Sequence, residues 1–281
     1  MATTTRIAST AGSTSVELET YDSGGDGRPV VLVHGWPLSG HAWRPQKSVL
    51  EDAGYRVVAF DRRGFGESDQ PEDGYDYDTM AGDVKAIVDE LGLDGAVLVG
   101  FSMGGGEVAR YVGRFGTSGL AGVVFASAIP PYLLKTDDNP DGGLSDDDVE
   151  EMKTGLADDR DGFLAGFAED FYTADGELKV DGDVVETWRT LASDASTTAA
   201  LECIDAFSRT DLRDDLRAID VPTLVIHGAG DQIVPIAVSG ERTAEMVEGA
   251  RLHVVEGGPH GINDSHTEEF NRVLLDFLGG L

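Results

Sequence analysis

Short runs of β-branched and other apolar residues recur along the chain, each followed by turn residues and then by a helical apolar period. Strands that are buried on both faces of a parallel sheet have this continuous apolar character, whereas strands with one solvated face alternate. The succession of strand, turn and helix therefore predicts an α/β fold with a mostly parallel central sheet flanked by helices. The predicted buried strands lie at 30–33, 57–60, 96–99, 123–126, 223–226 and 252–255.

Two further segments complete this predicted sheet and its helices. Residues 14–21 alternate between apolar and polar side chains, which predicts an antiparallel strand at the edge of the sheet. The last helix is expected to bury one face, because apolar residues recur there at helical spacing. These residues are Phe270, Val273, Leu274, Phe277 and Leu278.

The strand signal stops between residues 129 and 211, where helical patterns are broken by Gly and Asp. We expect residues 129–211 to form a helical cap inserted over the carboxyl edge of the sheet, with residues 1–128 and 212–281 as the core. Ser145 can cap a helix whose first turn carries three aspartates, which suit the positive end of the helix dipole. Four short helices are expected, with apolar stripes at Val149, Met152 and Leu156, at Phe163, Phe167 and Phe171, at Val184, Trp188 and Leu191, and at Leu201, Ile204 and Phe207.

The chain carries 52 Asp and Glu against 21 Lys and Arg, a formal net charge of −31 at pH 7. Such a charge repels phosphate backbones and anionic headgroups, so neither nucleic acid nor a membrane surface is an expected partner. The longest apolar runs are far shorter than the roughly 18 residues that a membrane span needs, and residues 1–6 lack the apolar core of a secretory signal. Cys203 is the only cysteine, so nothing indicates an oxidising compartment, and the expected location is cytoplasmic.

The motif Gly-Phe-Ser-Met-Gly at residues 100–104 stands between the predicted strand at 96–99 and a helical run. In a sharp strand-to-helix turn the central serine projects its hydroxyl at the rim of the sheet. Small residues are needed on both sides of it, because a Cβ there would clash across the turn. This context makes Ser102 a candidate nucleophile, with Gly100 and Gly104 as the turn residues.

A nucleophilic serine needs a general base and an acid that orients the base, and the hydrolase order along the chain is Ser, acid, His. His260 lies in a Gly-rich loop just after the strand at 252–255, at the same edge as Ser102, and is preferred to His266 for that reason. Asp231 follows the strand at 223–226 through small residues, which aims a carboxylate along the same rim. We therefore expect a catalytic triad of Ser102, Asp231 and His260. The histidines expected to have structural roles are His34, His227 and His253.

The oxyanion formed in acyl transfer needs two preorganised N–H donors. The expected donors are the N–H of Met103, directly after the serine, and the N–H of Trp36, in the loop after the strand at 30–33. Pro37 has no N–H to offer. The side chains of Trp36, Pro37, Phe101 and Met103 are expected to line the substrate pocket, and no metal ligand or cofactor is expected there.

Five segments of the chain carry a family resemblance: HGWP at 34–37, DRRGFGES at 61–68, GFSMGGGE at 100–107, KTDDNP at 135–140 and DQIVP at 231–235. They resemble the α/β-hydrolase superfamily, and within it the cofactor-free haloperoxidase/perhydrolase and arylesterase branch. The resemblance implies an α/β-hydrolase fold, the same triad and oxyanion donors, and a structural turn at 61–68.

Members of that branch hydrolyse small esters, and many make peracids from carboxylic acids and hydrogen peroxide without haem or metal. The resemblance therefore implies a small-molecule ester, or a carboxylic acid plus peroxide, as the substrate here. A proline after the oxyanion-hole aromatic residue, here Pro37, resembles the perhydrolytic members.

Related functions remain open at this level. Dehalogenases and epoxide hydrolases of this fold need a carboxylate where Ser102 stands, so they are not expected. Hydroxynitrile lyases and hydrolases acting on carbon–carbon bonds keep the same triad, and a non-catalytic ligand-binding protein could keep the same scaffold. The sequence is also compatible with a homo-oligomer.

A calcium loop is a second alternative that the sequence raises. Residues 137–142 (DDNPDG) have ligand types at loop positions one, three and five and a glycine at six, with Asp148 at position twelve. Pro140 within the loop and the shorter Asp at position twelve argue against calcium. A solvated acidic loop is the preferred interpretation.

The acidic composition, with only five lysines, is typical of proteins from a salt-rich cytosol. Repulsion between carboxylates destabilises the compact state in dilute buffer, whereas at 1 M salt the Debye length falls to about 3 Å and most of the penalty disappears. We therefore expect the melting temperature to rise across a KCl series. A melting temperature that does not respond to KCl would contradict this interpretation.

Overall fold

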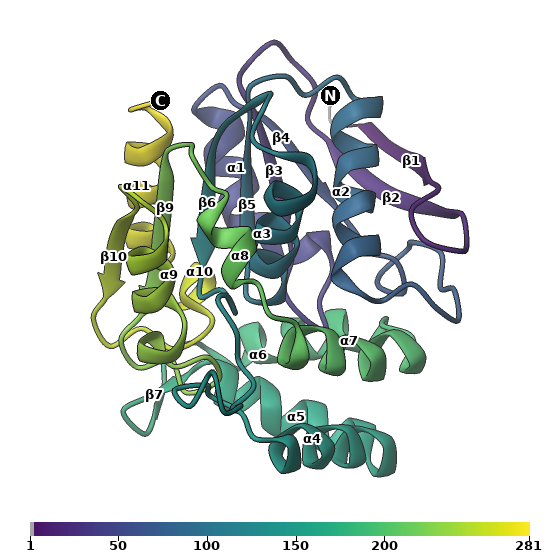
Figure 1. Cartoon of the computed structure of the whole chain (residues 1–281), viewed down its shortest axis with the longest axis vertical. Helices are drawn as coiled ribbons and strands as arrows, with labels where there is room; N and C mark the ends of the chain where they lie inside the picture. The colour runs from purple at the N-terminus through teal and green to yellow at the C-terminus, as the bar shows by residue number, and fades with distance from the viewer. Residues whose placement is uncertain (1–2) are drawn as a thin grey trace.

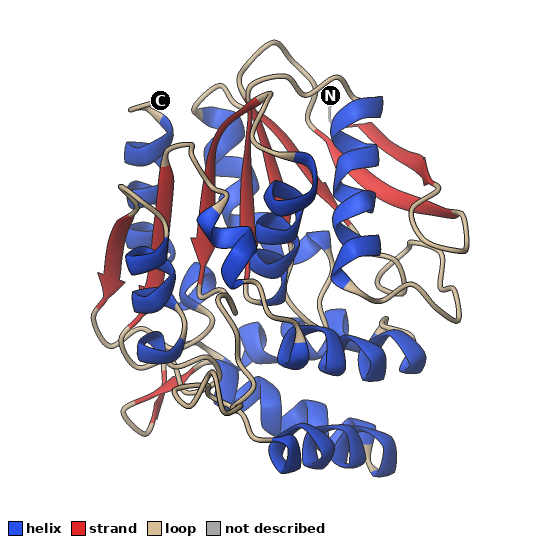
Figure 2. Cartoon of the chain, viewed as in Figure 1, coloured by secondary structure: helices blue, strands red, loops and turns tan. Residues whose placement is uncertain are grey.

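The computed structural model describes residues 3–281, so Met1 and Ala2 of the N-terminal stretch considered above lie outside the described residues. An eight-stranded sheet crosses the molecule with helices on both faces (Figures 1 and 2). The strand order is β1-β2-β4-β3-β5-β6-β9-β10, and the β1–β2 and β2–β4 pairs are antiparallel while the others are parallel. The predicted fold class is confirmed. The strands are β1 (Thr3–Ser9), β2 (Val16–Asp22), β3 (Pro29–Val33), β4 (Arg56–Phe60), β5 (Ala96–Phe101), β6 (Leu120–Ala126), β9 (Thr223–Gly228) and β10 (Arg251–Val255).

Both edges of the sheet differ from the prediction. The alternating segment at 14–21 does form an antiparallel strand, β2, but β1 pairs with β2 along its whole length and is the edge. Only Ile7 and Ser9 of β1 are buried, so β1 carries little apolar signal. At the other edge the sequence predicts a buried strand, yet Leu252 of β10 is 38% exposed, because β10 is the last strand on that side.

The helices that flank the sheet form two layers. Helices α1 and α11 pack together on one face, and α2, α3, α8 and α9 pack in succession on the other. The predicted apolar face of the last helix is confirmed, since its five expected residues are all buried. These elements are α1 (Arg44–Asp52), α2 (Tyr77–Glu90), α3 (Met103–Phe115), α8 (Arg213–Arg217), α9 (Gly240–Met246), α10 (Ile262–Ser265) and α11 (Thr267–Leu278), with short 3-10 turns η1 (Gly40–Trp43) and η2 (Ile236–Val238).

Helices α4 to α7 and a small hairpin lie between β6 and β9 in the chain, and they gather at the end of the sheet where the parallel strands finish (Figure 1). The four helices occur where the sequence predicts them. Ser145 Oγ accepts from the Asp148 N–H, and the Asp148 carboxylate accepts from the Ser145 N–H, so the predicted N-cap is a reciprocal capping box. The sequence does not predict the hairpin, whose strands have two residues each. These elements are α4 (Asp146–Asp158), α5 (Arg160–Phe171), β7 (Thr173–Ala174), β8 (Glu177–Leu178), α6 (Gly182–Ser193) and α7 (Thr197–Arg209).

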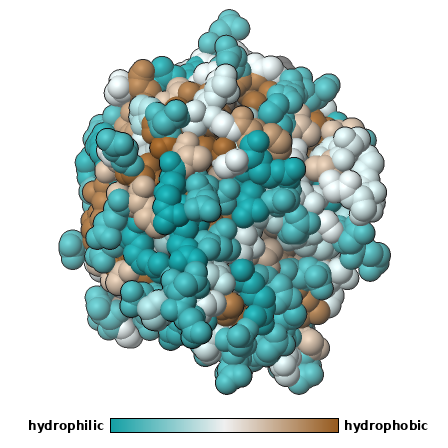
Figure 3. All heavy atoms as spheres, in the orientation of Figure 1, coloured by the Kyte–Doolittle hydropathy of each residue, from teal (hydrophilic) through white to brown (hydrophobic). Residues whose placement is uncertain are grey.

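The surface is strongly polar on the face shown in Figure 3. Acidic side chains surround several of the cations; Arg209, for example, pairs with Asp146, Glu150 and Asp205. Within residues 3–281, no helix combines the length and the apolar character that crossing a bilayer requires.

The turn between β5 and α3 is held in a strained conformation by close packing. Ser102 has φ 53° and ψ −120°, a region that residues other than glycine rarely adopt. A Cβ on Gly100 would lie 2.5 Å from the Gly104 carbonyl oxygen, and a Cβ on Gly104 would lie 2.4 Å from the Val33 carbonyl oxygen. The predicted need for small residues on both sides of the serine is confirmed. It places the start of α3 directly against the end of β3.

Gly104→Ala is therefore expected to destabilise the protein by about 1–3 kcal/mol or more, because the overlap is with backbone atoms that cannot rotate away. Gly166→Ala is the matched control: Gly166 is exposed on α5 with nothing near the position of a Cβ, and alanine favours a helix by up to about 1 kcal/mol. Urea unfolding of both variants in concentrated KCl measures the difference. Equal stability of the two variants would show that the close approach is not a constraint.

Candidate active site

Three side chains from three strand ends meet at the carboxyl edge of the sheet. Ser102 follows β5, Asp231 lies in the loop after β9, and His260 lies in the loop after β10. His260 Nε2 lies 2.9 Å from Ser102 Oγ, and His260 Nδ1 lies 2.7 Å from Asp231 Oδ2. The structure thus brings the three predicted residues together in one continuous chain of hydrogen bonds.

The Asp231 carboxylate is buried, and donors surround both of its oxygens. Its Oδ1 accepts from the N–H groups of Ile233 and Val234 at 3.0 and 2.8 Å, while Oδ2 faces His260 and, at 3.2 Å, His227 Nε2. Burial by itself raises the pKa of Asp231, but the neighbouring His260 and the hydrogen bonds from both histidines outweigh burial and lower the pKa to about 2. The group is therefore a carboxylate at neutral pH. It orients the Nδ1–H of His260 and leaves Nε2 as the acceptor toward the serine.

Two aromatic rings pack against the imidazole of His260. The ring centroids of Phe101 and Phe171 lie 5.3 and 4.8 Å from that of the imidazole, and the next residue, Gly261, donates its N–H to the Phe171 carbonyl.

His266, the alternative base, has its Nδ1 3.0 Å from Ser265 Oγ instead. Of the remaining histidines, His34 Nδ1 lies 2.8 Å from Gly35 O and His253 Nε2 lies 2.8 Å from Glu269 Oε1. His227 Nε2 lies 2.8 Å from Val234 O as well as 3.2 Å from the Asp231 carboxylate, so His227 supports the site as well as the loop.

Two backbone N–H groups lie beside the serine. Met103 is the first residue of α3, and the N–H groups of a first helical turn have no acceptor within the helix. Trp36 lies in the loop after β3, where its indole Nε1 donates to Ala200 O at 3.0 Å and fixes the side chain. Among residues 3–281, neither backbone N–H donates to another protein group. The predicted role of these two N–H groups as oxyanion donors stays a prediction here.

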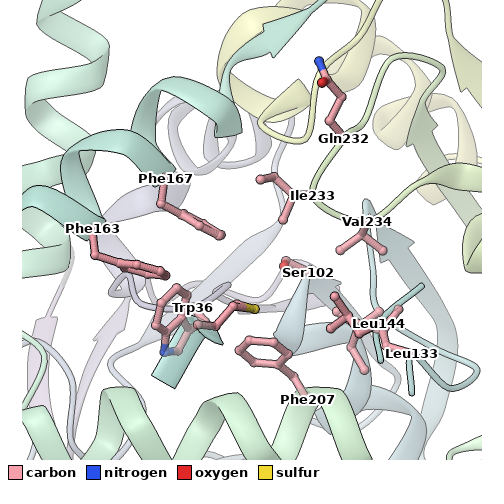
Figure 4. A pocket seen from close by; sticks show the side chains of 12 residues that line it. Trp36, Ser102, Leu133, Leu144, Phe163, Phe167, Phe207, Gln232, Ile233 and Val234 are labelled. Atoms are coloured by element: carbon pink, nitrogen blue, oxygen red, sulfur yellow. The ribbon is translucent and has the colours of Figure 1, made fainter. Parts of the chain in front are cut away.

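An apolar cavity of about 210 Å³ adjoins Ser102 (Figure 4). Phe163 and Phe167 of α5 and Phe207 of α7 project toward it from the helices around it. Ser102 and Gln232 are the polar side chains in its wall. The other lining residues are Trp36, Ile129, Leu133, Leu144, Met152, Ile233 and Val234.

Of the four side chains predicted to line the pocket, only Trp36 does so. Phe101 packs behind the site instead, with its ring centroid 6.1 Å from that of Trp43. Met103 and Pro37 are buried away from the cavity. The prediction was wrong for these three residues because closeness in sequence to the serine or to an oxyanion donor does not fix the direction of a side chain.

Sequence reasoning missed most of the actual lining, although part of the signal was present. Met152, Phe163, Phe167 and Phe207 belong to the apolar stripes predicted for the cap helices, but the sequence did not assign them to a pocket. Apolar residues that pack in a core and apolar residues that line a cavity recur at the same helical spacing in a sequence. Only the arrangement of α4, α5 and α7 around Ser102 distinguishes the two.

The loop at 137–142 uses its polar groups within the protein. Asn139 Nδ2 donates to Tyr132 O and Leu134 O, and Asn139 Oδ1 accepts from Arg242 Nη2 at 2.6 Å. The Asp148 carboxylate caps α4. Across the described range 3–281, no group of three or more His, Cys, Asp or Glu side chains is arranged to hold a metal ion. These contacts give the calcium alternative no support.

A mostly parallel sheet that carries a serine on a sharp strand-to-helix turn, with histidine and aspartate at neighbouring strand ends, defines the class of α/β-fold serine enzymes. The family model described as alpha/beta hydrolase fold matches residues 28–267. The chain belongs to this family.

Similar proteins include peroxidases and esterases of that family. The chain is 45% identical over 262 residues to a non-heme chloroperoxidase of Kitasatospora aureofaciens, covering 92% of this chain and 94% of that protein. It is 41% identical over 266 residues to a bifunctional esterase/perhydrolase of Acinetobacter calcoaceticus, covering 94% and 96%. A crystal structure of a bromoperoxidase from Bacillus anthracis matches with a TM-score of 0.93 and 45% identity, covering 98% of this chain and 100% of that one. The resemblance drawn from the five motifs is confirmed.

Proposed function

We propose that this chain is a serine hydrolase that cleaves small carboxylic esters through an acyl-enzyme, and that hydrogen peroxide can replace water as the acyl acceptor. The observation that carries the proposal is the hydrogen-bonded chain from Asp231 through His260 to Ser102, which ends at the wall of an apolar cavity. The names of two relatives, an esterase/perhydrolase and a non-heme chloroperoxidase, support the same chemistry.

In the first half of the proposed reaction, Ser102 Oγ attacks the ester carbonyl carbon while His260 Nε2 takes the hydroxyl proton. Asp231 stabilises the imidazolium that forms, and the N–H groups of Met103 and Trp36 bind the oxyanion. Collapse of this intermediate breaks the bond to the alcohol oxygen, which leaves with the proton from His260. The acyl group stays on Ser102.

In the second half, His260 removes a proton from water or hydrogen peroxide, and the resulting oxygen nucleophile attacks the acyl carbon. The bond to Ser102 Oγ then breaks, and the serine regains its proton from His260. Water yields the carboxylic acid, whereas peroxide yields the peracid. A peracid oxidises bromide by two electrons to hypobromous acid and becomes the carboxylic acid again. The halide is therefore oxidised by the peracid that the site produces, and the hypobromous acid is the halogenating agent.

The composition of the cavity supports uncharged substrates. None of its twelve lining side chains is charged, and burying an unpaired charge in such a wall is costly. We assign residues 129–211 as the cap and residues 1–128 and 212–281 as the core. The cap then supplies the aromatic side chains of α5 and α7 that select the acyl or alcohol group.

The proposed setting is a salt-rich cytoplasm. The net charge of −31 supports it, and the same charge disfavours nucleic acid and membranes as partners. The expected partners are a small-molecule ester, or a carboxylic acid with peroxide, and the chain is compatible with a homo-oligomer. The KCl melting series tests the salt dependence.

Ester hydrolysis should depend on the three residues of the chain of hydrogen bonds. With p-nitrophenyl acetate in roughly 2 M KCl, where folding is favoured, Ser102→Ala is expected to abolish turnover. Asp231→Asn is expected to lower kcat by about 10³–10⁴-fold, because the imidazole loses the anion that orients it. His260→Gln should be inactive while His266→Gln, the matched control, keeps wild-type activity. A folded wild type without turnover, or an active Ser102→Ala variant, would contradict the proposal.

Use of peroxide is tested separately. In acetate buffer with hydrogen peroxide and bromide, the wild type is expected to brominate a phenol dye faster than the peroxide blank, and Ser102→Ala should match the blank. The reason is that peracid forms only from the acyl-enzyme. A wild type that hydrolyses esters but does not exceed the blank would remove the peroxide part of the proposal and leave the esterase part intact.

A further inference from the structure

The Trp36 oxyanion donor depends on the orientation of one peptide plane. In a trans peptide the carbonyl and the N–H point in opposite directions, so whatever holds the Gly35 carbonyl also aims the Trp36 N–H. Two groups hold that carbonyl: the Leu38 N–H at 3.0 Å and the His34 ring at 2.8 Å, measured to His34 Nδ1. The direction of the Trp36 N–H is therefore set by the Leu38 N–H and the His34 side chain together.

The tautomer of His34 follows from its contacts. Its Nε2 lies 3.0 Å from the Arg62 backbone N–H, which can only donate, so Nε2 is the acceptor and the ring proton is on Nδ1. Nδ1 has two neighbours, the Gly35 carbonyl at 2.8 Å and Arg62 Nη1 at 3.3 Å, and the nearer one accepts the Nδ1–H. Burial lowers the pKa of His34 well below 6.5, and the positive charge of Arg62 lowers it further, so the ring is neutral.

Arg62 contacts His34 at three points and is itself held by an acid. Besides the backbone N–H on the ring, Arg62 Nη2 donates to the His34 carbonyl at 2.6 Å, and Arg62 Nη1 lies 3.3 Å from His34 Nδ1. Arg62 Nε donates to Glu107 Oε1, and both side chains of this ion pair are 1% exposed. Glu107 lies on α3, one turn after Met103. The pair thus joins the loop that carries one oxyanion donor to the helix that carries the other.

We propose that the buried Arg62–Glu107 ion pair is a positioning element of the oxyanion hole: through His34 and the Gly35 carbonyl it sets the Trp36 N–H against the Met103 N–H. This inference rests on the proposed acyl-transfer function. Neither charged residue touches the cavity, so the pair acts on the oxyanion through the backbone and leaves substrate binding to the cavity wall.

The neighbouring residue in sequence forms a second ion pair of the same kind. Arg63 donates to both carboxylate oxygens of Asp83 at 2.6 and 2.7 Å, and these side chains are 0% and 1% exposed. Arg63 also donates to Ala11 O, so this pair joins α2 to the segment after β1 rather than to the oxyanion loop. Asp83→Asn is therefore a control with matched chemistry and burial, because Asp83 forms its ion pair with Arg63 and not with the residues that hold His34.

The main variant is Glu107→Gln. Burial raises the pKa of Glu107, and the positive charge of Arg62 opposes that rise. The amide of the variant keeps the shape of the carboxylate and removes its charge. The variant is expected to fold. It should lower kcat for p-nitrophenyl acetate by about 10-fold or more, toward the 10²–10³-fold that loss of one oxyanion donor costs, with KM changed little.

Two inhibitors separate oxyanion binding from cavity binding. An alkyl trifluoromethyl ketone forms an oxyanion adduct with the serine, and its Ki should rise in Glu107→Gln by the same factor as kcat/KM falls. The corresponding methyl ketone occupies the cavity without a stable adduct, and its Ki should not change. Asp83→Asn should lower the melting temperature as Glu107→Gln does, yet keep wild-type kcat and both Ki values.

Arg62→Lys is the second variant, and it keeps the positive charge beside Glu107 but lacks the second arm that reaches the His34 carbonyl. It should reproduce the loss of kcat. The inference is overturned if both variants keep wild-type kcat, or if Asp83→Asn loses as much kcat as Glu107→Gln at the same loss of melting temperature. Absence of Ser102-dependent turnover in the wild type would remove the proposed function as well, whereas an active wild type with unaffected variants overturns this inference alone.

Discussion

The site depends on how closely the start of α3 approaches the end of β3. A Cβ at Gly104 would overlap the Val33 carbonyl, so only glycine lets the two backbones touch at this point. Because they touch, the Met103 N–H and the Trp36 N–H come to lie beside one serine although they are far apart in the sequence. Ser102 takes its positive φ from the same turn, at a cost of about 1–3 kcal/mol that the surrounding sheet has to offset. The backbone thus fixes the proposed nucleophile and the two proposed oxyanion donors together.

Charged residues have different roles at the surface and in the interior of this molecule. The chain has 52 acidic residues against 21 Lys and Arg, and most of its ion pairs are exposed at the surface, where they contribute little to stability. Inside, Arg62 and Arg63 are enclosed with one carboxylate each. A buried ion pair adds little net stability over an apolar pair, but its hydrogen bonds impose a geometry that apolar contacts do not. The two buried pairs of this chain therefore fix how the segments that they join are oriented.

The sequence predicted the three central residues of the site because each follows a strand of a parallel sheet, and strand ends in such a sheet meet at one edge. Ser102, Asp231 and His260 could therefore be placed together without any knowledge of the cap. Other features gave no such signal. The edge strand β1 buries only alternate residues near its end, and the contact of Arg62 with Glu107 joins positions 45 apart that no periodicity relates. The helical part of the cavity wall depends on how α4, α5 and α7 pack, which apolar stripes do not specify.

Helix α5 is in direct contact with the loop that carries His260, the proposed general base. Gly261, next to His260, donates its N–H to the Phe171 carbonyl at the end of α5, and a Cβ on Gly261 would lie 2.4 Å from the Tyr172 ring. The same helix carries Phe163 and Phe167 into the cavity (Figure 4). One helix, α5, thus carries side chains of the cavity wall and holds the loop of His260, so both parts of the proposed site rest on the same element.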